Sequence, residues 1–442
     1  MAQSPLKKIL IIAGLMLVLV APLLMIQAKI NERQQRAAMV SQEVSRQYAG
    51  EQTVSGPVIM VPQVRRHEVA YQDQESGERR TRAEFRHELA SQVPDTLTIE
   101  GQLKTRTLYR GIYGTPVYQS GLNLEARFPE NWQQVSDRAV RDRGPALLVL
   151  RVGDLRGLAE RPRLRIGERT LPLLEPGEIP EALGGNVLVA PLPRELNGPF
   201  TVSVDLNLNG SRSLAALPLA KETRMTLRGD WPHPGFTGLL LPADREISDQ
   251  GFMGRWYTNS LAAASTLACA RDTARCQERD KALRVELVQP VTGLLSSERA
   301  LKYSYLIVGL TFAAFFLFEV MRRVSVHPMQ YLLVGLALAM FYLLLVALGE
   351  HLDFAWAYGI GGLACVGLIG VYLSAVLRSG KAGWGFAGAQ GLVLALIYAI
   401  LNAEDYALLM GSLLLFATLA AVMLLTRHVD WGAHARGQQG TS

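Results

Sequence analysis

The sequence predicts a membrane protein of the α+β class, with six transmembrane helices and a large antiparallel β-rich, sandwich-like domain inserted between helix 1 and helix 2. Its 442 residues are 49% apolar and only 19% charged, which is unusually apolar for a soluble chain. Six long apolar segments occur, one near the N-terminus and five after residue 302. The region between them shows the polar and apolar alternation that is typical of strands.

The first apolar segment, residues 9–28, contains no charged residue and can cross a hydrocarbon core about 30 Å thick. It is longer than the roughly 7 to 15 apolar residues of a cleavable signal peptide, and Lys7 and Lys8 precede it. We therefore predict a signal anchor that remains in the protein. Residues 31–48 are polar with spaced apolar positions, which predicts that this helix continues beyond the membrane.

Charges in the short loops orient the predicted spans. Basic residues follow the second, fourth and sixth spans, whereas the loops after the third and fifth spans carry acidic residues and neither Lys nor Arg. By the positive-inside rule, residues 1–8 and 426–442 are cytoplasmic and residues 29–302 lie on the other side of the membrane. The five C-terminal spans are predicted at 303–321, 329–349, 355–376, 383–401 and 406–425.

The net charge of +6 arises mainly from this topology. Residues 31–300 contain 35 basic and 33 acidic residues, so the inserted domain is nearly neutral. A nucleic-acid partner is therefore not indicated, because such proteins carry a basic surface. The partner that the sequence does imply is the lipid bilayer.

Short alternating runs interrupted by turn residues predict the inserted β domain. Alternation is clear in "TLTIEGQLKTRTLY" and in "FTVSVDLNLNGSRSLAAL". Asn209-Gly210 is the strongest two-residue hairpin signal, and a second hairpin is predicted at Ser76-Gly77. These features favour an antiparallel sandwich with a sizeable core.

Cys269 and Cys276 lie in an Ala-rich segment that is predicted to be helical. In a continuous helix their Cα atoms would be about 10.5 Å apart, beyond the roughly 7 Å limit for a disulfide. A disulfide between them therefore requires a break in the helix, for which Asp272-Thr273 is the natural place. Free thiols are the alternative, and Cys365 is predicted to be a small packing residue in the fourth span.

The sequence contains no pattern that predicts a catalytic, cofactor or metal site. The seven histidines form no ligand-spaced pair, and neither a nucleophile elbow nor a phosphate-binding loop occurs. Gly359, Gly362, Gly367 and Gly370 are predicted to permit close helix packing, since small residues let backbones approach. We accordingly predict no cofactor and no catalytic residue.

Glu319 is the clearest charge inside a predicted span, and its position alone allows two interpretations: an interfacial residue or an intramembrane polar site. It lies three residues before Arg322, close enough to the cytoplasmic end to pair there. A transport pathway would instead need polar groups at depth, and Glu319, Tyr398 and Asn402 are the candidates. Both interpretations stay open on the sequence alone.

"WPHPGF", residues 231–236, is the most distinctive stretch of the inserted domain. Pro232 and Pro234 fix the backbone on both sides of His233 and remove two hydrogen-bond donors, which predicts a rigid extended turn. We favour a structural role, in which the aromatic rings cap the sheet core. The alternative is a recognition surface made by Trp231, His233 and Phe236. Leu239–Pro242 and then Glu246–Trp256 are expected to form the next two strands.

Four segments resemble the CreD family of bacterial inner-membrane proteins: "SGPVIMVP" (55–62), "WPHPGF" (231–236), "SVHPMQYLLVGLALAMFYLLLVALGEH" (325–351) and "LTRHVDW" (425–431). The likeness covers nearly the whole chain. It implies an inner-membrane location, in which the exported residues 29–302 would be a periplasmic domain, and an association with the Cre two-component regulon, envelope integrity, colicin tolerance and the β-lactam response. It implies no enzymatic activity and no cofactor.

Three functions remain open at this point. The leading one is a non-enzymatic inner-membrane protein that supports or senses the envelope, with an envelope protein, peptidoglycan or a lipid as its partner. The second is a transporter or lipid-handling protein that uses the five C-terminal helices. The third is an envelope enzyme, which would need clustered acids, His or Ser in an exported pocket. Neither the partner nor the oligomeric state follows from the sequence.

Overall fold

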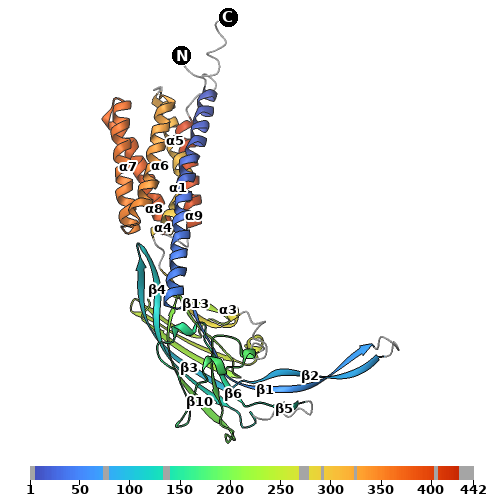
Figure 1. Cartoon of the computed structure of the whole chain (residues 1–442). Helices are drawn as coiled ribbons and strands as arrows, with labels where there is room; N and C mark the ends of the chain where they lie inside the picture. The colour runs from blue at the N-terminus through green and yellow to red at the C-terminus, as the bar shows by residue number, and fades with distance from the viewer. Residues whose placement is uncertain are drawn as a thin grey trace. The chain divides into compact units, whose positions relative to one another are not determined.

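The computed structural model describes residues 5–72, 79–132, 140–267, 278–289, 293–322, 326–402 and 407–427. The chain divides into two compact units (Figure 1). A helical unit contains Met1–Ala38 and Val291–Ser442, and a β-rich unit contains Met39–Pro290. The β-rich unit is thus inserted into the helical one, and its bounds lie inside the predicted 29–302.

The helices begin and end close to the predicted apolar segments. Helix α1 is 44 residues long, so the predicted span 9–28 and its polar continuation form one helix. The helix α4 that precedes the predicted second span is amphipathic and belongs to the helical unit. The helices of the helical unit are α1 (Pro5–Tyr48), α4 (Gly293–Lys302), α5 (Ser304–Arg322), α6 (Pro328–Leu348), α7 (Phe354–Val376), α8 (Gly380–Asn402) and α9 (Ala407–Thr426), and the β-rich unit adds the short helices α2 (Ala264–Leu267) and α3 (Glu278–Lys281).

Four helices are long and apolar enough to cross a membrane where the sequence predicts six spans, counted over the described residues. They are α1 over Leu10–Tyr48, α6, α7 and α8. Helices α5 and α9 occupy the positions of the two other predicted spans, but their apolar stretches, Ser304–Glu319 and Leu409–Ala420, are shorter.

Only some of the glycines in the helical unit lie where two helices pack closely. A Cβ at Gly335 of α6 would collide with Leu19 of α1, so glycine permits this contact. Gly370 of α7 lies against Trp384 and Ala387 of α8, as predicted. Gly359 and Gly367, in contrast, have no atom of another described element within 4 Å of the place that a Cβ would occupy, so the prediction of close packing is wrong for them.

The β-rich unit consists of two eight-stranded sheets over the residues described. The first sheet has the order β13-β16-β11-β1-β6-β9, with β2 and β5 also paired to β1. Its strands are β1 (Gln52–Gln72), β2 (Arg79–Gln92), β5 (Val140–Arg143), β6 (Leu147–Arg151), β9 (Val187–Pro191), β11 (Ser213–Leu217), β13 (Pro234–Gly238) and β16 (Leu283–Leu287). The paired strands β1 and β2 extend as a long ribbon from the rest of the unit (Figure 1).

The second sheet has the order β14-β15-β12-β3-β4-β10-β7-β8. Its strands are β3 (Thr96–Arg110), β4 (Tyr113–Phe128), β7 (Arg163–Ile166), β8 (Arg169–Leu171), β10 (Phe200–Ser211), β12 (Glu222–Gly229), β14 (Asp244–Ser248) and β15 (Gly251–Asn259). Strands β1 and β11 pair in parallel, as do β3 and β12. The prediction of an antiparallel domain is therefore wrong at these two pairs, because strand direction depends on long-range connections that local alternation does not encode.

One apolar core joins the two sheets. Leu148, Leu214 and Val285 reach it from the first sheet, and Leu124 and Val204 reach it from the second; all are at most 2% exposed. Along β4 every second residue from Ser120 to Phe128 is buried, as expected for a strand with one covered face. Two sheets that share a core in this way have the layered arrangement of a sandwich.

The hairpin predicted at Asn209-Gly210 does not form. Strand β10 continues through both residues and pairs with β4 as far as Ser211 opposite Val117. The chain turns at Arg212, whose φ is 65°, and then enters the other sheet. Gly210 is required by packing instead, since a Cβ there would collide with the Tyr118 hydroxyl.

The second predicted hairpin is consistent with the sheet pairing. Strands β1 and β2 pair antiparallel from Ile59 opposite Gln92 to Gln72 opposite Arg79. Ser76-Gly77 lies outside the described residues.

The contact between Gly210 and Tyr118 gives a stability prediction. Gly210→Ala should lower the free energy of unfolding by about 1 to 3 kcal/mol, because the added methyl overpacks a buried ring. Thermal and chemical unfolding of the full chain in detergent would measure this. Gly177→Ala is the matched control, since nothing lies within 4 Å of its Cβ position, and it should change stability by less than about 0.5 kcal/mol. Equal effects of both substitutions would contradict the prediction.

Candidate functional site

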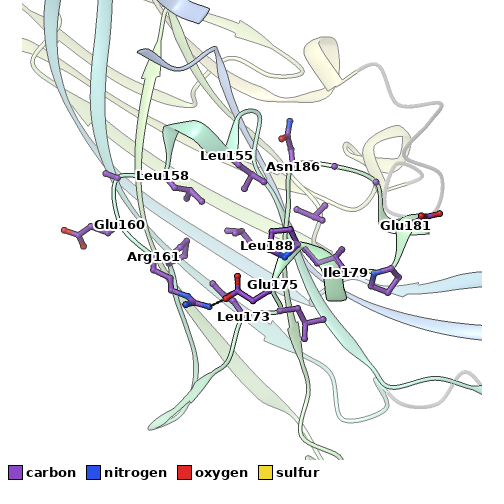
Figure 2. Close-up of a pocket in the computed structure, with 18 residues that line it drawn as sticks. Leu155, Leu158, Glu160, Arg161, Leu173, Glu175, Ile179, Glu181, Asn186 and Leu188 are labelled. Carbon is purple, nitrogen blue, oxygen red and sulfur yellow. Dashed lines mark hydrogen bonds and ion pairs between the residues drawn. The ribbon is translucent and has the colours of Figure 1, made fainter. Parts of the chain in front are cut away.

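The β-rich unit contains an open groove with a volume of about 890 Å³ (Figure 2). Three short 3-10 helices contribute to the region: η1 (Leu155–Gly157), η2 (Pro176–Glu178) and η3 (Glu181–Leu183). The segment before β7, the connection from β8 to β9 and the start of β9 line the groove. Since β8 and β9 end their respective sheets, the groove lies where the edges of the two sheets part.

The groove walls are apolar and belong to two different clusters. Leu155, Leu158 and Leu173 pack against the core that the two sheets share. Leu174 and Ile179 pack against a separate cluster that contains Met60, Leu147, Val149, Leu183, Val187 and Val189. The floor of the groove is therefore formed by partly buried apolar side chains. Ligand pockets are commonly lined in this way.

Backbone hydrogen bonds hold the connection between β8 and β9 in place. The Leu174 amide donates to the Val189 carbonyl at 2.8 Å, and the Val152 amide donates to the Asn186 carbonyl at 3.0 Å. The Arg151 guanidinium donates to the Leu183 carbonyl at 2.7 Å. An irregular segment is thus fixed as a wall of the groove.

Carboxylates outnumber cations at the rim. Arg161 pairs with Glu175 at 2.9 Å, and Glu160 and Glu181 lie at opposite sides of the groove (Figure 2). The rim thus has three carboxylates and one guanidinium among the lining residues. Such an arrangement suits a ligand with an apolar body and a positive charge.

Asp154 positions the η1 wall. Its carboxylate accepts hydrogen bonds from the Gly50 amide at 3.2 Å, the Arg156 amide at 3.0 Å and the Arg156 guanidinium at 2.7 Å. The hydrogen-bonded Arg156 side chain lowers the pKa of Asp154 to about 2. The charged carboxylate therefore stabilises the turn that carries Leu155 and Leu158.

The predicted recognition triplet does not form one exposed surface. Trp231 and Phe236 are half-buried and pack against the shared core. His233, which lies between them in sequence, is exposed. The Trp231 indole donates to the Val288 carbonyl at 2.9 Å, and Phe236 stacks edge-on against Trp256 at 5.7 Å. The two aromatic residues thus occupy the capping position that we favour.

The strands that follow this stretch differ from those expected. Pro234–Gly238 forms the edge strand β13, whereas Leu239–Pro242 is not a strand. Glu246–Trp256 is not one strand but parts of β14 and β15, which are joined at Asp249-Gln250. Gly251 has a φ of 145°, a conformation that side chains disfavour, and therefore permits this tight reversal.

Glu319 lies in a closed polar cluster in the helical unit. It pairs with Lys8 of α1, and it accepts hydrogen bonds from the Tyr331 hydroxyl at 2.9 Å and the Val326 amide at 3.2 Å. Lys8 also donates to the Val326 carbonyl at 3.0 Å. The described partners of Glu319 thus include Lys8, on a helix far away in sequence, which spacing from Arg322 could not reveal.

The groove that the structure describes in the helical unit does not bring together Glu319, Tyr398 and Asn402, the candidates for a polar pathway. A groove between α5 and α8 has a volume of about 460 Å³, and none of these three residues lines it. Tyr398 packs against the rings of Phe354 and Tyr358. Asn402 is exposed near the end of α8.

The cysteines allow only a partial comparison. Cys269 and Cys276 lie outside the described residues, so the predicted disulfide stays a prediction. Cys365 is buried and donates from Sγ to the Ala337 carbonyl at 3.4 Å. Within the described ranges, His, Cys, Asp and Glu form no group of three that could hold a metal ion.

The sequence reasoning missed the groove. Its wall comes from "LPLLEPGEIPEALGGN", residues 171–186, which has neither helical nor strand periodicity. The signal that could have indicated it is the presence of several leucine and isoleucine residues in a segment whose prolines and glycines mark it as a long loop. A loop that keeps apolar residues usually covers or lines something.

The long apolar helices and the large β-rich unit define a membrane protein with an inserted β domain. A protein-family model described as "Inner membrane protein CreD" matches residues 4–432. The "Inner membrane protein CreD" of Escherichia coli (strain K12) is 34% identical over 440 residues, which cover 98% of this chain and 95% of that protein. The chain therefore belongs to the CreD family of inner membrane proteins.

The lowered pKa of Asp154 predicts a pH-dependent stability. The pKa is about 2 in the folded chain and about 3.9 when unfolded, so this contribution is complete above about pH 5 and is lost as the pH falls towards about 2. At pH 7, Asp154→Asn should lower the free energy of unfolding by about 1 kcal/mol, after allowance for solvent screening. Unfolding curves of the full chain between pH 7 and pH 2.5 would measure the difference.

Asp205→Asn is the control for this experiment, because Asp205 and Arg165 form an exposed ion pair at 3.0 Å. Such pairs contribute little, and the change should be below about 0.5 kcal/mol. A destabilisation by Asp154→Asn that stays constant down to pH 2.5 would contradict the role assigned to its charge.

Proposed function

We propose that this inner membrane protein supports or senses envelope integrity by binding, without catalysis, an envelope protein through the groove of its β-rich unit. In this proposal the β-rich unit is periplasmic, both termini are cytoplasmic, and α5 and α9 cross the membrane together with α1, α6, α7 and α8. The groove is the observation that carries the proposal.

The charge of the loops supports this orientation. Arg378 and Lys381 follow α7, whereas Glu350 and Asp353 follow α6. Basic residues stay on the cytoplasmic side, so α6 ends outside and α7 ends inside. Helix α5 must then cross, because α6 begins on the side where α5 ends.

The chemistry of the groove favours one of the three partner classes that the sequence leaves open. Peptidoglycan is rich in hydroxyl groups and would leave the leucine walls without apolar partners. Anionic lipids would meet the like charge of Glu160 and Glu181. A protein segment with apolar and basic side chains complements both the floor and the rim.

A binding role fits the lining residues better than nucleophilic catalysis does. The lining residues comprise aliphatic and proline side chains, glycines, three glutamates, one arginine and one asparagine, and Arg161 already occupies Glu175. A hydrolase of the common nucleophilic type needs Ser, Cys or Thr beside a base. The groove supplies shape and charge instead.

Reporter fusions test the orientation. A fusion after Arg323 should report a cytoplasmic location and a fusion after Asp353 an external one, because α5 and α6 each cross the membrane once in this topology. Alkaline phosphatase and a fluorescent protein, which are active on opposite sides, would give matched readouts. An external location of the Arg323 fusion would show that α5 does not cross or that the orientation is reversed.

A photo-crosslinking amino acid at Leu173 tests the groove. In living cells it should form a crosslink to an envelope protein, and mass spectrometry should identify the captured segment as apolar and basic. Glu181→Lys should reduce the yield about fivefold or more, as the loss of roughly 1 kcal/mol of attraction implies. Gly185→Trp should abolish it, because the indole fills the groove.

Two matched variants control this experiment. Glu168→Lys makes the same charge change on an exposed turn that does not line the groove, and Gly177→Trp adds the same bulk in open space. Both should retain the crosslink and should restore growth under envelope stress, such as detergent, in cells that lack the native gene. Capture of lipid or glycan, or equal loss in the control variants, would refute the proposed partner.

A further inference from the structure

The groove between α5 and α8 in the helical unit has a polar feature that packing does not explain. Gln390 is only 4% exposed and lines the groove. The Thr311 hydroxyl donates a hydrogen bond to the Gln390 Oε1 atom at 2.8 Å, and the Gln390 Nε2 atom has no hydrogen-bond partner in the described part of the chain. An unpaired amide inside a membrane is unfavourable, so a ligand that supplies a partner would be stabilised there.

The groove is apolar along its length and charged at one end. Leu310, Ala314, Leu317, Phe318 and Val393 supply most of the apolar wall. Lys381, in the first turn of α8, carries the charge among the described lining residues. Contacts between Thr311 and Gln390, and between Phe315 and Phe386, show that the two helices run antiparallel.

The dimensions favour an acyl chain over a helix. From Lys381 to Val393 the groove extends about 18 Å along α8, and Lys381 and Gln390 are about 13.5 Å apart along the same axis, so one headgroup contacts both when the stem of Lys381 extends into the groove. A helical segment of that length and about 10 Å in diameter would occupy about 1,400 Å³, three times the 460 Å³ of the groove. One lipid chain from the leaflet at the Lys381 end is therefore the better occupant.

From these observations we propose that the α5–α8 groove binds one anionic glycerophospholipid, with its phosphate at the Lys381 ammonium, an ester oxygen at the Gln390 amide and the acyl chain of that ester continuing past Gln390 and Val393. The flexible four-carbon stem of Lys381 lets its ammonium follow the phosphate into the groove. An ester carbonyl accepts a hydrogen bond from Nε2. Basic pockets between membrane helices recognise anionic headgroups in this way.

Native mass spectrometry of the full chain would test this lipid site, with dioleoylphosphatidylglycerol and dioleoylphosphatidylcholine as probes. The wild-type protein should retain one phosphatidylglycerol and should prefer it over phosphatidylcholine. Lys381→Ala should reduce that preference about fivefold, as expected for one basic contact. Gln390→Leu should reduce the retention of both lipids, because it removes the hydrogen bond at the ester.

Three variants separate the site from general effects. Gly385→Phe places a ring in the groove and should abolish retention, whereas Gly388→Phe adds the same ring at a position that does not line it. Arg378→Asn removes a neighbouring basic residue outside the groove and suits the left-handed backbone there, with a φ of 48°. Both Gly388→Phe and Arg378→Asn should retain the lipid preference.

Several results would overturn the lipid site. They are equal retention of the two lipids by the wild-type protein, unchanged retention in Gly385→Phe, and a dimer that Gly385→Phe dissociates, which would show that a second copy fills the groove. Circular dichroism of each variant would confirm that the helices remain folded. The outcome is independent of the crosslinking at Leu173, since the two grooves share no residue.

Discussion

Strand β11 lies between the first and the last strand of the β-rich unit, and this pairing constrains the rest of the fold. It pairs in parallel with β1, where Gln52 lies opposite Leu214, and antiparallel with β16, where Val285 lies opposite the same Leu214. The chain therefore arrives along β1 and leaves along β16 in the opposite direction. An inserted domain whose two ends are adjacent can be accommodated between two helices without disturbing them.

A buried amide fixes the point at which β1 begins. Gln52 has no exposed surface, and its Nε2 donates to the carbonyls of Asp154 at 3.1 Å and Asn209 at 2.9 Å while its Oε1 accepts from the Asp154 amide at 3.0 Å. One side chain of β1 thus holds two segments that are distant in sequence. Leaving any of these groups unpaired would cost about 1 to 3 kcal/mol, which explains why glycine is needed at Gly157 and Gly210, whose Cβ atoms would displace Gln52.

Local sequence patterns predicted the elements whose conformation depends on burial of a single segment. Apolar length located the helices from α5 to α9, and alternation located β3 and β10, because both reflect burial of one segment against its surroundings. The pattern failed where distant contacts decide the conformation. Asn209-Gly210 is typical of a turn, but pairing with β4 and contact with Tyr118 keep it extended. The direction of β11 and the partnership of Lys8 with Glu319 likewise depend on residues far apart in sequence.

The same distinction applies to the two grooves. Neither the wall at Leu173 nor the amide at Gln390 belongs to a motif, since each becomes a site only through its neighbours in space. Their charges nevertheless demand different ligands: the carboxylate rim of the β-rich unit repels an anionic headgroup, whereas Lys381 attracts one. A cationic protein segment and an anionic lipid therefore do not compete for the same surface. A protein with both sites would bind an envelope protein through one groove and an anionic lipid of its own membrane through the other, and the two contacts would be independent.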